Sequence, residues 1–103
     1  MKTKEYLLEP KAGEITVQTN KDCLPMGAII KNQDIYVVCM VDDTSPKVIK
    51  SFMIVPCGED INGPAGAGLT NIGVVQKPLG LEKGTNMVIW QTFVILEIIY
   101  QKD

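Results

Sequence analysis

The sequence contains neither histidine nor arginine, and these two absences limit the chemistry open to the chain. Without histidine there is no Ser-His or Cys-His nucleophile pair, no H-E-x-x-H zinc helix and no imidazole proton shuttle near neutral pH. Without arginine the chain lacks the usual residue for bidentate phosphate and guanine contacts and for clamping a transferred phosphoryl group. Its basic residues are scattered lysines, and the net charge is -2. We therefore expect no catalytic residues and no direct nucleic-acid binding.

Cysteine is also scarce, and long apolar runs are missing. Cys23, Cys39 and Cys57 form an odd set without a C-x-x-C pair, which argues against a disulfide framework or a zinc site and suits a reducing compartment. The most hydrophobic stretch, residues 87–100, is shorter than the roughly 20 apolar residues of a membrane-spanning helix. No apolar leader segment follows the first lysines. These features predict a cytoplasmic protein without membrane contact, cofactor or metal.

Helical periodicity is weak, whereas β-branched residues occur in short runs bounded by Gly, Pro, Asn and Asp. The length of 103 residues fits a single domain, residues 1–103. The sequence predicts a mainly β fold, a small antiparallel sheet that is barrel-like or sandwich-like, with a long Gly/Pro-rich loop. Strands are expected at residues 4–8, 14–19, 28–31, 34–41, 47–55, 71–76 and 86–100.

Two polar segments have the composition of hairpin turns. Residues 31–34 (Lys-Asn-Gln-Asp) separate two β-rich runs, and residues 42–46 (Asp-Asp-Thr-Ser-Pro) separate the next two. Cys23 precedes a Leu-Pro pair that is also expected to lie in a turn. The three runs at 28–31, 34–41 and 47–55 are therefore predicted to form an antiparallel meander.

The strands at 34–41 and 86–100 are apolar on both faces, unlike a sheet with one wet face. Residues 35, 37, 39 and 41 share one face of the first strand, opposite Tyr36, Val38 and Met40. Cys39, Trp90 and Phe93 are expected to be core residues. The second apolar face needs a cover, and either a second copy of the chain or a folded-over N-terminal segment would supply it. We expect a homo-oligomer.

The segment from Pro56 to Leu69 is the most unusual in the chain, with four glycines and two prolines. It lacks the G-K-[ST] ending of a phosphate loop and the spacing of a calcium loop, but flexible loops on rigid sheets often make binding contacts. Cys57 is interpreted as a partly buried structural residue, because neighbouring carboxylates disfavour a reactive thiolate. A tyrosine that points outward is also a candidate contact, since tyrosine is enriched at interfaces. The predicted binding residues are Glu59, Asp60, Asn62, Gly63, Gly66, Gly68 and Tyr36.

Several short motifs after Leu24 resemble an uncharacterised family of small bacteriophage and prophage β proteins. The matching residues are a Pro25-Met26-Gly27-Ala28 turn, Gln33, Val41-Asp42, Phe52, Ile54, Gly58, Ile72-Gly73, Trp90 and Phe93. The chain departs from the family pattern at Glu59 and Gln91, where the family often has histidines, so any role of those histidines does not carry over. The resemblance implies a phage or mobile-element origin and a small β fold, and it implies no activity.

The resemblance and the missing catalytic residues together favour a non-enzymatic accessory protein. Such a protein would bind a host protein or a small signalling molecule in the infected bacterium, for example as an anti-CRISPR or nucleotide-sequestering counter-defence inhibitor. A virion structural or assembly protein is the first alternative. A histidine-free enzyme that uses a thiol or carboxylates is the second.

Overall fold

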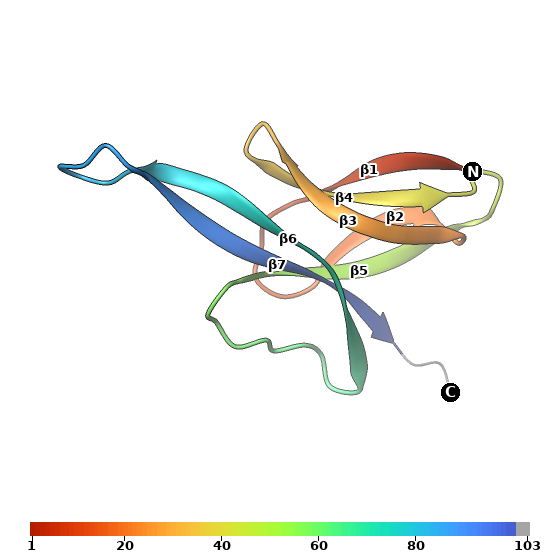
Figure 1. The fold of residues 1–103 in the computed structure, drawn as a ribbon. Helices are drawn as coiled ribbons and strands as arrows, with labels where there is room; N and C mark the ends of the chain where they lie inside the picture. The colour runs from red at the N-terminus through yellow and green to blue at the C-terminus, as the bar shows by residue number, and fades with distance from the viewer. Residues whose placement is uncertain (101–103) are drawn as a thin grey trace.

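Seven antiparallel strands make up the fold in the computed structural model, which describes residues 1–100 (Figure 1). The strands are β1 (Lys2–Leu8), β2 (Ile15–Asn20), β3 (Cys23–Lys31), β4 (Asp34–Val41), β5 (Lys47–Pro56), β6 (Ala67–Leu81) and β7 (Val88–Tyr100). Sheet A has the order β1-β4-β3, and sheet B has the order β2-β5-β7-β6. The predicted mainly β class, barrel-like or sandwich-like, is confirmed as an all-β fold of two small antiparallel sheets, which do not join into a closed barrel. Residues 1–100 include no helix with the length and apolarity needed to cross a membrane.

The predicted turn between the third and fourth strands is confirmed. β3 and β4 pair in antiparallel register down to Lys31 opposite Asp34. The two residues of the turn, Asn32 and Gln33, have φ values of 51° and 70°. Two consecutive positive φ angles characterise the tight turn whose twist matches that of paired strands, and asparagine tolerates this conformation better than most residues.

The predicted meander is wrong beyond this hairpin, because β5 belongs to the other sheet. β5 pairs with β2 and β7, and residues 42–46 cross from sheet A to sheet B. Hydrogen bonds fasten this crossing to the β2–β3 connection, from Lys21 N to Pro46 O at 2.7 Å and from Asp42 N to Asp22 O at 3.0 Å. A short polar segment that ends in proline is compatible with either a hairpin or a crossing. The apolar faces of the two sheets decide between them.

The segment around Pro25 also differs from expectation. It is part of β3 rather than a turn, and the strand register shifts between Pro25 and Gly27. A bulge accommodates a proline that cannot donate to the strand ladder. Cys23 is therefore a buried strand residue.

The main core lies between the two sheets. Phe52 of β5 and Ile95 of β7 are fully buried against Val37 and Cys39 of β4, which confirms the predicted core position of Cys39. At one margin β3 packs closely against β6, where a Cβ placed on Gly73 would be only 3.3 Å from the Ala28 backbone nitrogen. Glycine permits this approach of the two sheet edges.

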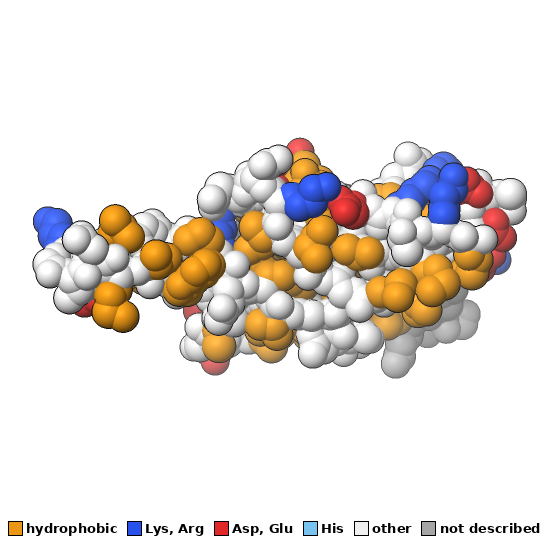
Figure 2. Space-filling model, turned by 45° about the horizontal axis from the view of Figure 1, so that its top comes forward, with side chains coloured by type: hydrophobic (Ala, Val, Ile, Leu, Met, Phe, Trp, Pro, Cys, Tyr) orange, Lys and Arg blue, Asp and Glu red, His pale blue; other side chains and the backbone are white. Residues whose placement is uncertain are grey.

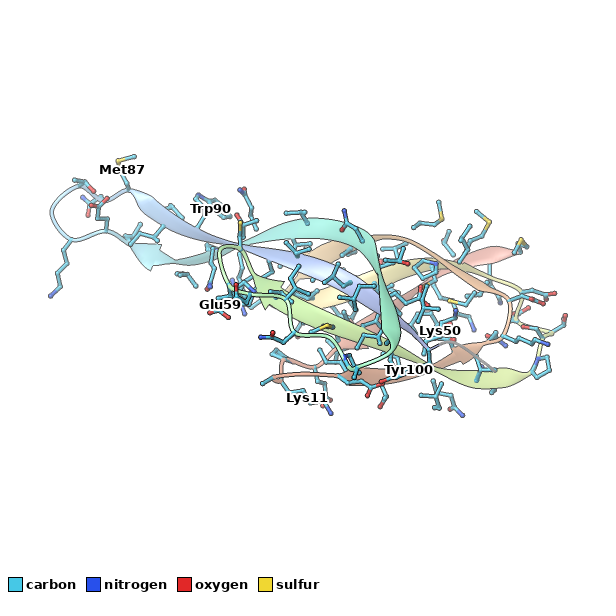
Figure 3. The ribbon with its side chains drawn as sticks, turned by 90° about the horizontal axis from the view of Figure 1, so that it is seen from below. Lys11, Lys50, Glu59, Met87, Trp90 and Tyr100 are labelled. Atoms are coloured by element: carbon cyan, nitrogen blue, oxygen red, sulfur yellow. The ribbon has the colours of Figure 1, made fainter. Side chains whose placement is uncertain are left out.

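A second apolar cluster covers the opposite face of sheet B. Met53, Val55, Leu96 and Ile98 are buried there and pack with Ala67 and Val94. The β5–β6 loop (residues 57–66) lies on this side of the sheet, away from sheet A (Figures 1 and 3). Part of the second apolar face of the last strand is therefore buried within the chain itself. The outer face of sheet A, in contrast, leaves Leu24 and Met26 exposed.

The ends of β6 and β7 continue beyond the body as a two-stranded hairpin, here called the arm (residues 78–91; Figure 1). The expectation that Trp90 is a core residue is wrong, because its side chain is 56% exposed on the arm. Phe93, three residues later, is partly buried and packs against the main core. Period-two apolarity identified the strand correctly, but it could not show that the second apolar cluster, on the face that Trp90 shares with Val94 and Leu96, ends before Trp90.

Candidate ligand-binding cleft

A cleft of about 590 Å³ opens at the end of the two sheets where three connections meet. The β1–β2 connection, the β3–β4 turn and the start of the β5–β6 loop all reach this end, next to the base of the arm. The cleft is lined by Pro10, Lys11, Ala12, Gly13, Gln33, Ile35, Met53, Ile54, Val55, Pro56, Glu59, Asp60, Asn62, Lys77 and Phe93. Its volume lies within the range of about 300–1,000 Å³ that small-molecule sites occupy.

The apolar part of the lining comes from both apolar clusters. Ile35 from sheet A is buried in the main core, and Ile54 and Phe93 from sheet B pack against it, whereas Met53 and Val55 belong to the second cluster. The cleft therefore has walls fixed by strand pairing on both sides, which restricts their movement. Phe93 contributes an aromatic side chain to this otherwise aliphatic lining.

The polar part of the lining comes from segments far apart in the sequence. Glu59, Asp60 and Asn62 belong to the β5–β6 loop, Lys11 to the β1–β2 connection, and Lys77 to β6 at the base of the arm. Figure 3 shows Lys11 and Glu59 on two different connections of the body. With Gln33 from the β3–β4 turn, two lysines, two carboxylates and two amides thus border one apolar cleft.

Backbone hydrogen bonds fix the start of the loop that carries the acidic residues. Cys57 N donates to Thr92 O at 2.8 Å, and Glu59 N donates to Pro56 O at 3.1 Å. Between them Gly58 has a φ of 97°, a left-handed conformation that favours glycine. This tight turn directly after β5 presents Glu59 to the cleft.

The structure brings together only part of the predicted binding set. Glu59, Asp60 and Asn62 line the cleft, and the three glycines do not. A Cβ on Gly63 would lie 3.1 Å from the Leu69 side chain, Gly66 has a positive φ of 79°, and Gly68 pairs with Ile99 in the β6–β7 ladder. These glycines shape the loop and the start of β6.

Tyr36 lies away from the cleft. It follows the cleft residue Ile35 in β4, so its side chain is on the outer face of sheet A. The ammonium of Lys31 lies 5.7 Å from the centre of the Tyr36 ring, and it is also paired with Glu5 at 2.8 Å. The loop residues and Tyr36 therefore cannot contact the same small ligand.

Sequence reasoning missed Lys11, Lys77, Gln33 and Phe93 as cleft residues. Lys11 stands between Pro10 and Gly13 in a turn-like segment, and Lys77 precedes Pro78. These signals indicate exposed turns or strand margins, and they do not reveal that the fold brings the two lysines to one cleft. For Gln33 the sequence predicts only a place in a turn.

The cysteines differ in their surroundings. Cys57 is exposed, so its interpretation as a partly buried residue is wrong. Its neighbour Pro56 lines the cleft and Cys57 does not. Burial, together with the nearby Cys23 thiol, raises the pKa of the Cys39 thiol far above its usual range, which disfavours the reactive thiolate. No group of three acidic or cysteine side chains in residues 1–100 is arranged to hold a metal ion.

Comparisons with known proteins add no relative. No family model, curated protein or solved structure matches the chain significantly.

Proposed function

We propose that the protein is a non-enzymatic binding module that holds a small organic molecule in the cleft. The observation that carries the proposal is the gathering of Lys11, Lys77, Glu59, Asp60 and Asn62 around an apolar cavity of small-molecule size. Ligand sites typically combine mostly apolar walls with a few convergent polar groups that fix orientation. The polar groups here come from three separate segments, as expected of residues brought together by the fold.

The chemistry of the lining suits a nucleotide-like signalling molecule. A planar ring would pack against Phe93 and the aliphatic wall, and its exocyclic amines would donate to Glu59 or Asp60. A phosphate would meet the ammonium of Lys11 or Lys77, which binds phosphate as a point charge. The two carboxylates would repel additional phosphates, so we expect weakly charged nucleotides to be preferred.

The biological setting of this proposal rests on the resemblance to small phage proteins. A binder that captures a host signalling nucleotide in the bacterial cytoplasm would act as a counter-defence inhibitor by sequestration. The absence of histidine and arginine from the sequence favours binding without turnover.

Isothermal titration calorimetry with adenosine monophosphate and with a cyclic dinucleotide tests the proposal. Replacing Lys11 or Lys77 by alanine should weaken binding about tenfold or more each, because charged hydrogen bonds contribute roughly 1.5–3 kcal/mol. Lys21→Ala is the matched control, since Lys21 is an exposed lysine outside the cleft lining. Absence of binding for both probes, or equal weakening by the control, would contradict the proposal.

A recovery experiment separates sequestration from catalysis. After incubation with the protein and then denaturation, a sequestered nucleotide should elute unchanged in chromatography. Conversion of the nucleotide would instead support the enzyme alternative. A control incubation with heat-denatured protein excludes breakdown of the nucleotide itself.

An assembly role in the virion is the second candidate, and the arm is the observation that favours it. Exposed apolar hairpins are typical of surfaces that are covered after assembly. Mass spectrometry of purified phage particles tests this role, because an assembly component should be present in them in stoichiometric amounts.

A further inference from the structure

The arm exposes large apolar side chains along both of its strands. Its large apolar side chains are 44–63% exposed and include Leu79, Leu81, Met87, Val88, Ile89 and Trp90. Figure 2 shows hydrophobic side chains on the projecting arm and further ones over the body. An isolated hairpin is marginally stable at best, and apolar patches of this kind mark interaction sites.

The two edges of the arm differ in how they are protected against strand pairing. The β6 edge carries Pro78 and a register shift that ends at Gly80, and Lys77 directly precedes it. Lysine, proline and bulges are the devices by which natural edges avoid pairing with other chains. The β7 edge, residues 88–91, has the sequence Val-Ile-Trp-Gln, with no charge, proline or glycine. Of the two edges, only that of β7 is left open.

The direction of the backbone groups on this edge follows from the ladder. Thr92 O accepts from Cys57 N, so the main-chain groups of Thr92 point away from β6. Main-chain groups alternate in direction along an antiparallel strand, so those of Trp90 and Val88 also point away from β6. The pairing of Trp90 with Pro78, which has no N–H group, fits this assignment.

No strand receives these groups within the part of the chain that the structure describes. β5 pairs with β7 only from Phe93 onward, opposite Pro56. The hydrogen bond from Cys57 N to Thr92 O is the last main-chain hydrogen bond before the β5–β6 loop leaves the β7 edge. The N–H and C=O groups of Val88 and Trp90 thus form a short, unpaired and apolar template for another strand.

We propose that this β7 edge pairs antiparallel with the same edge of a second copy of the chain, about a two-fold axis near Ile89 that places Val88 of each copy opposite Trp90 of the other. An antiparallel pair of identical strands is isologous, so a single interface satisfies both copies and closes the assembly as a dimer. The two arms would then cover each other's apolar side chains. The pairing cannot extend past Thr92, because the main-chain oxygen of Thr92 already accepts a hydrogen bond from Cys57 N.

A second copy suits this edge better than an occasional partner. A transient partner would leave the apolar side chains in water between encounters, whereas an identical chain is present whenever the protein is. Interfaces that are always occupied are the more hydrophobic class, in agreement with an arm edge without charge. This inference does not depend on the ligand proposed for the cleft.

Trp90 is the only tryptophan, so its fluorescence reports on the arm directly. On dilution of the wild-type protein we expect its emission to shift to longer wavelength while sedimentation velocity shows a dimer dissociating to a monomer. Trp90→Lys should weaken the dimer at least about 30-fold, as substitution of a central interface tryptophan does. Leu24→Lys is the matched control, because Leu24 is 60% exposed on the outer face of sheet A. The control should leave the dimer unchanged.

Amide hydrogen exchange of the wild-type protein tests the edge without any substitution. In the dimer the amides of Val88 and Trp90 should be protected to a similar degree as those of Ile89 and Gln91, which face β6. Rapid exchange at Val88 and Trp90 beside slow exchange at Ile89 and Gln91 would show an open edge and overturn the proposal. A clean monomer at high micromolar concentration, or a dimer weakened equally by Leu24→Lys, would also overturn it.

Discussion

Replacing Gly73 by valine tests the closest approach between the two sheets. A Cβ at this position of β6 would lie 3.3 Å from the Ala28 backbone nitrogen and 3.8 Å from the Gly27 Cα. These are backbone atoms of β3, so they cannot rotate away as a side chain would. To relieve the clash, the β3 edge of sheet A and the β6 edge of sheet B would have to move apart.

Gly68 of the same strand provides the matched control. A Cβ there would meet only the Ile99 carbonyl oxygen, at an ordinary 3.8 Å. Neither glycine has a positive φ, so valine is compatible with both backbones. The higher β-strand propensity of valine over glycine should stabilise the folded state by up to about 1 kcal/mol at either site. The two substitutions therefore differ mainly in packing.

Overpacking typically costs about 1–3 kcal/mol, so Gly73→Val should lower the free energy of unfolding by about 1–2 kcal/mol after the gain in strand preference. Gly68→Val should leave it unchanged or raise it by up to about 1 kcal/mol. Urea unfolding followed by circular dichroism measures both, with equal slopes confirming an unchanged unfolding transition. Equal stabilities of the two variants would refute the close packing of β3 on β6.

Three further predictions concern the core, the thiols and acid sensitivity. Phe52→Ala should lower the free energy of unfolding by about 3–5 kcal/mol in the same urea assay, because Phe52 is fully buried between the sheets; a loss below about 1 kcal/mol would place it outside the core. Cys57 should react with a thiol reagent in the native protein, whereas Cys39 should react only after unfolding, and mass spectrometry of labelled peptides distinguishes them. The neighbouring hydroxyls of Ser51 and Tyr100 lower the pKa of the Glu14 carboxyl in the folded state. The stabilising contribution of the Glu14 carboxylate is therefore present above the pKa of the unfolded state and is lost as the pH falls through the lower pKa of the folded state. Glu14→Gln should make thermal unfolding less dependent on pH in that acidic window, and an unchanged dependence would contradict this.

Local sequence patterns correctly predict the structural features that depend only on residues close together in the chain. The tight turn at Asn32 and Gln33 follows from its polar residues between β-rich runs. The alternation in β4 correctly placed Cys39 in the core, because the pleat sends alternate side chains to opposite faces. The loop after Pro56 was identified by its glycines and prolines, and three of its polar residues do line the cleft.

The sequence by itself therefore determined the β class, the β3–β4 hairpin and the composition of the loop. Only the tertiary structure decided which sheet β5 joins, which side chains meet at the cleft and where β7 leaves the body. Lys11 and Lys77 are 66 positions apart in the chain, and no local period brings them together. Trp90 and Ile95 share one apolar strand, yet one is half exposed and the other fully buried. The physical reason is that a period of two gives the faces of a strand, whereas burial depends on whether another layer lies over that face.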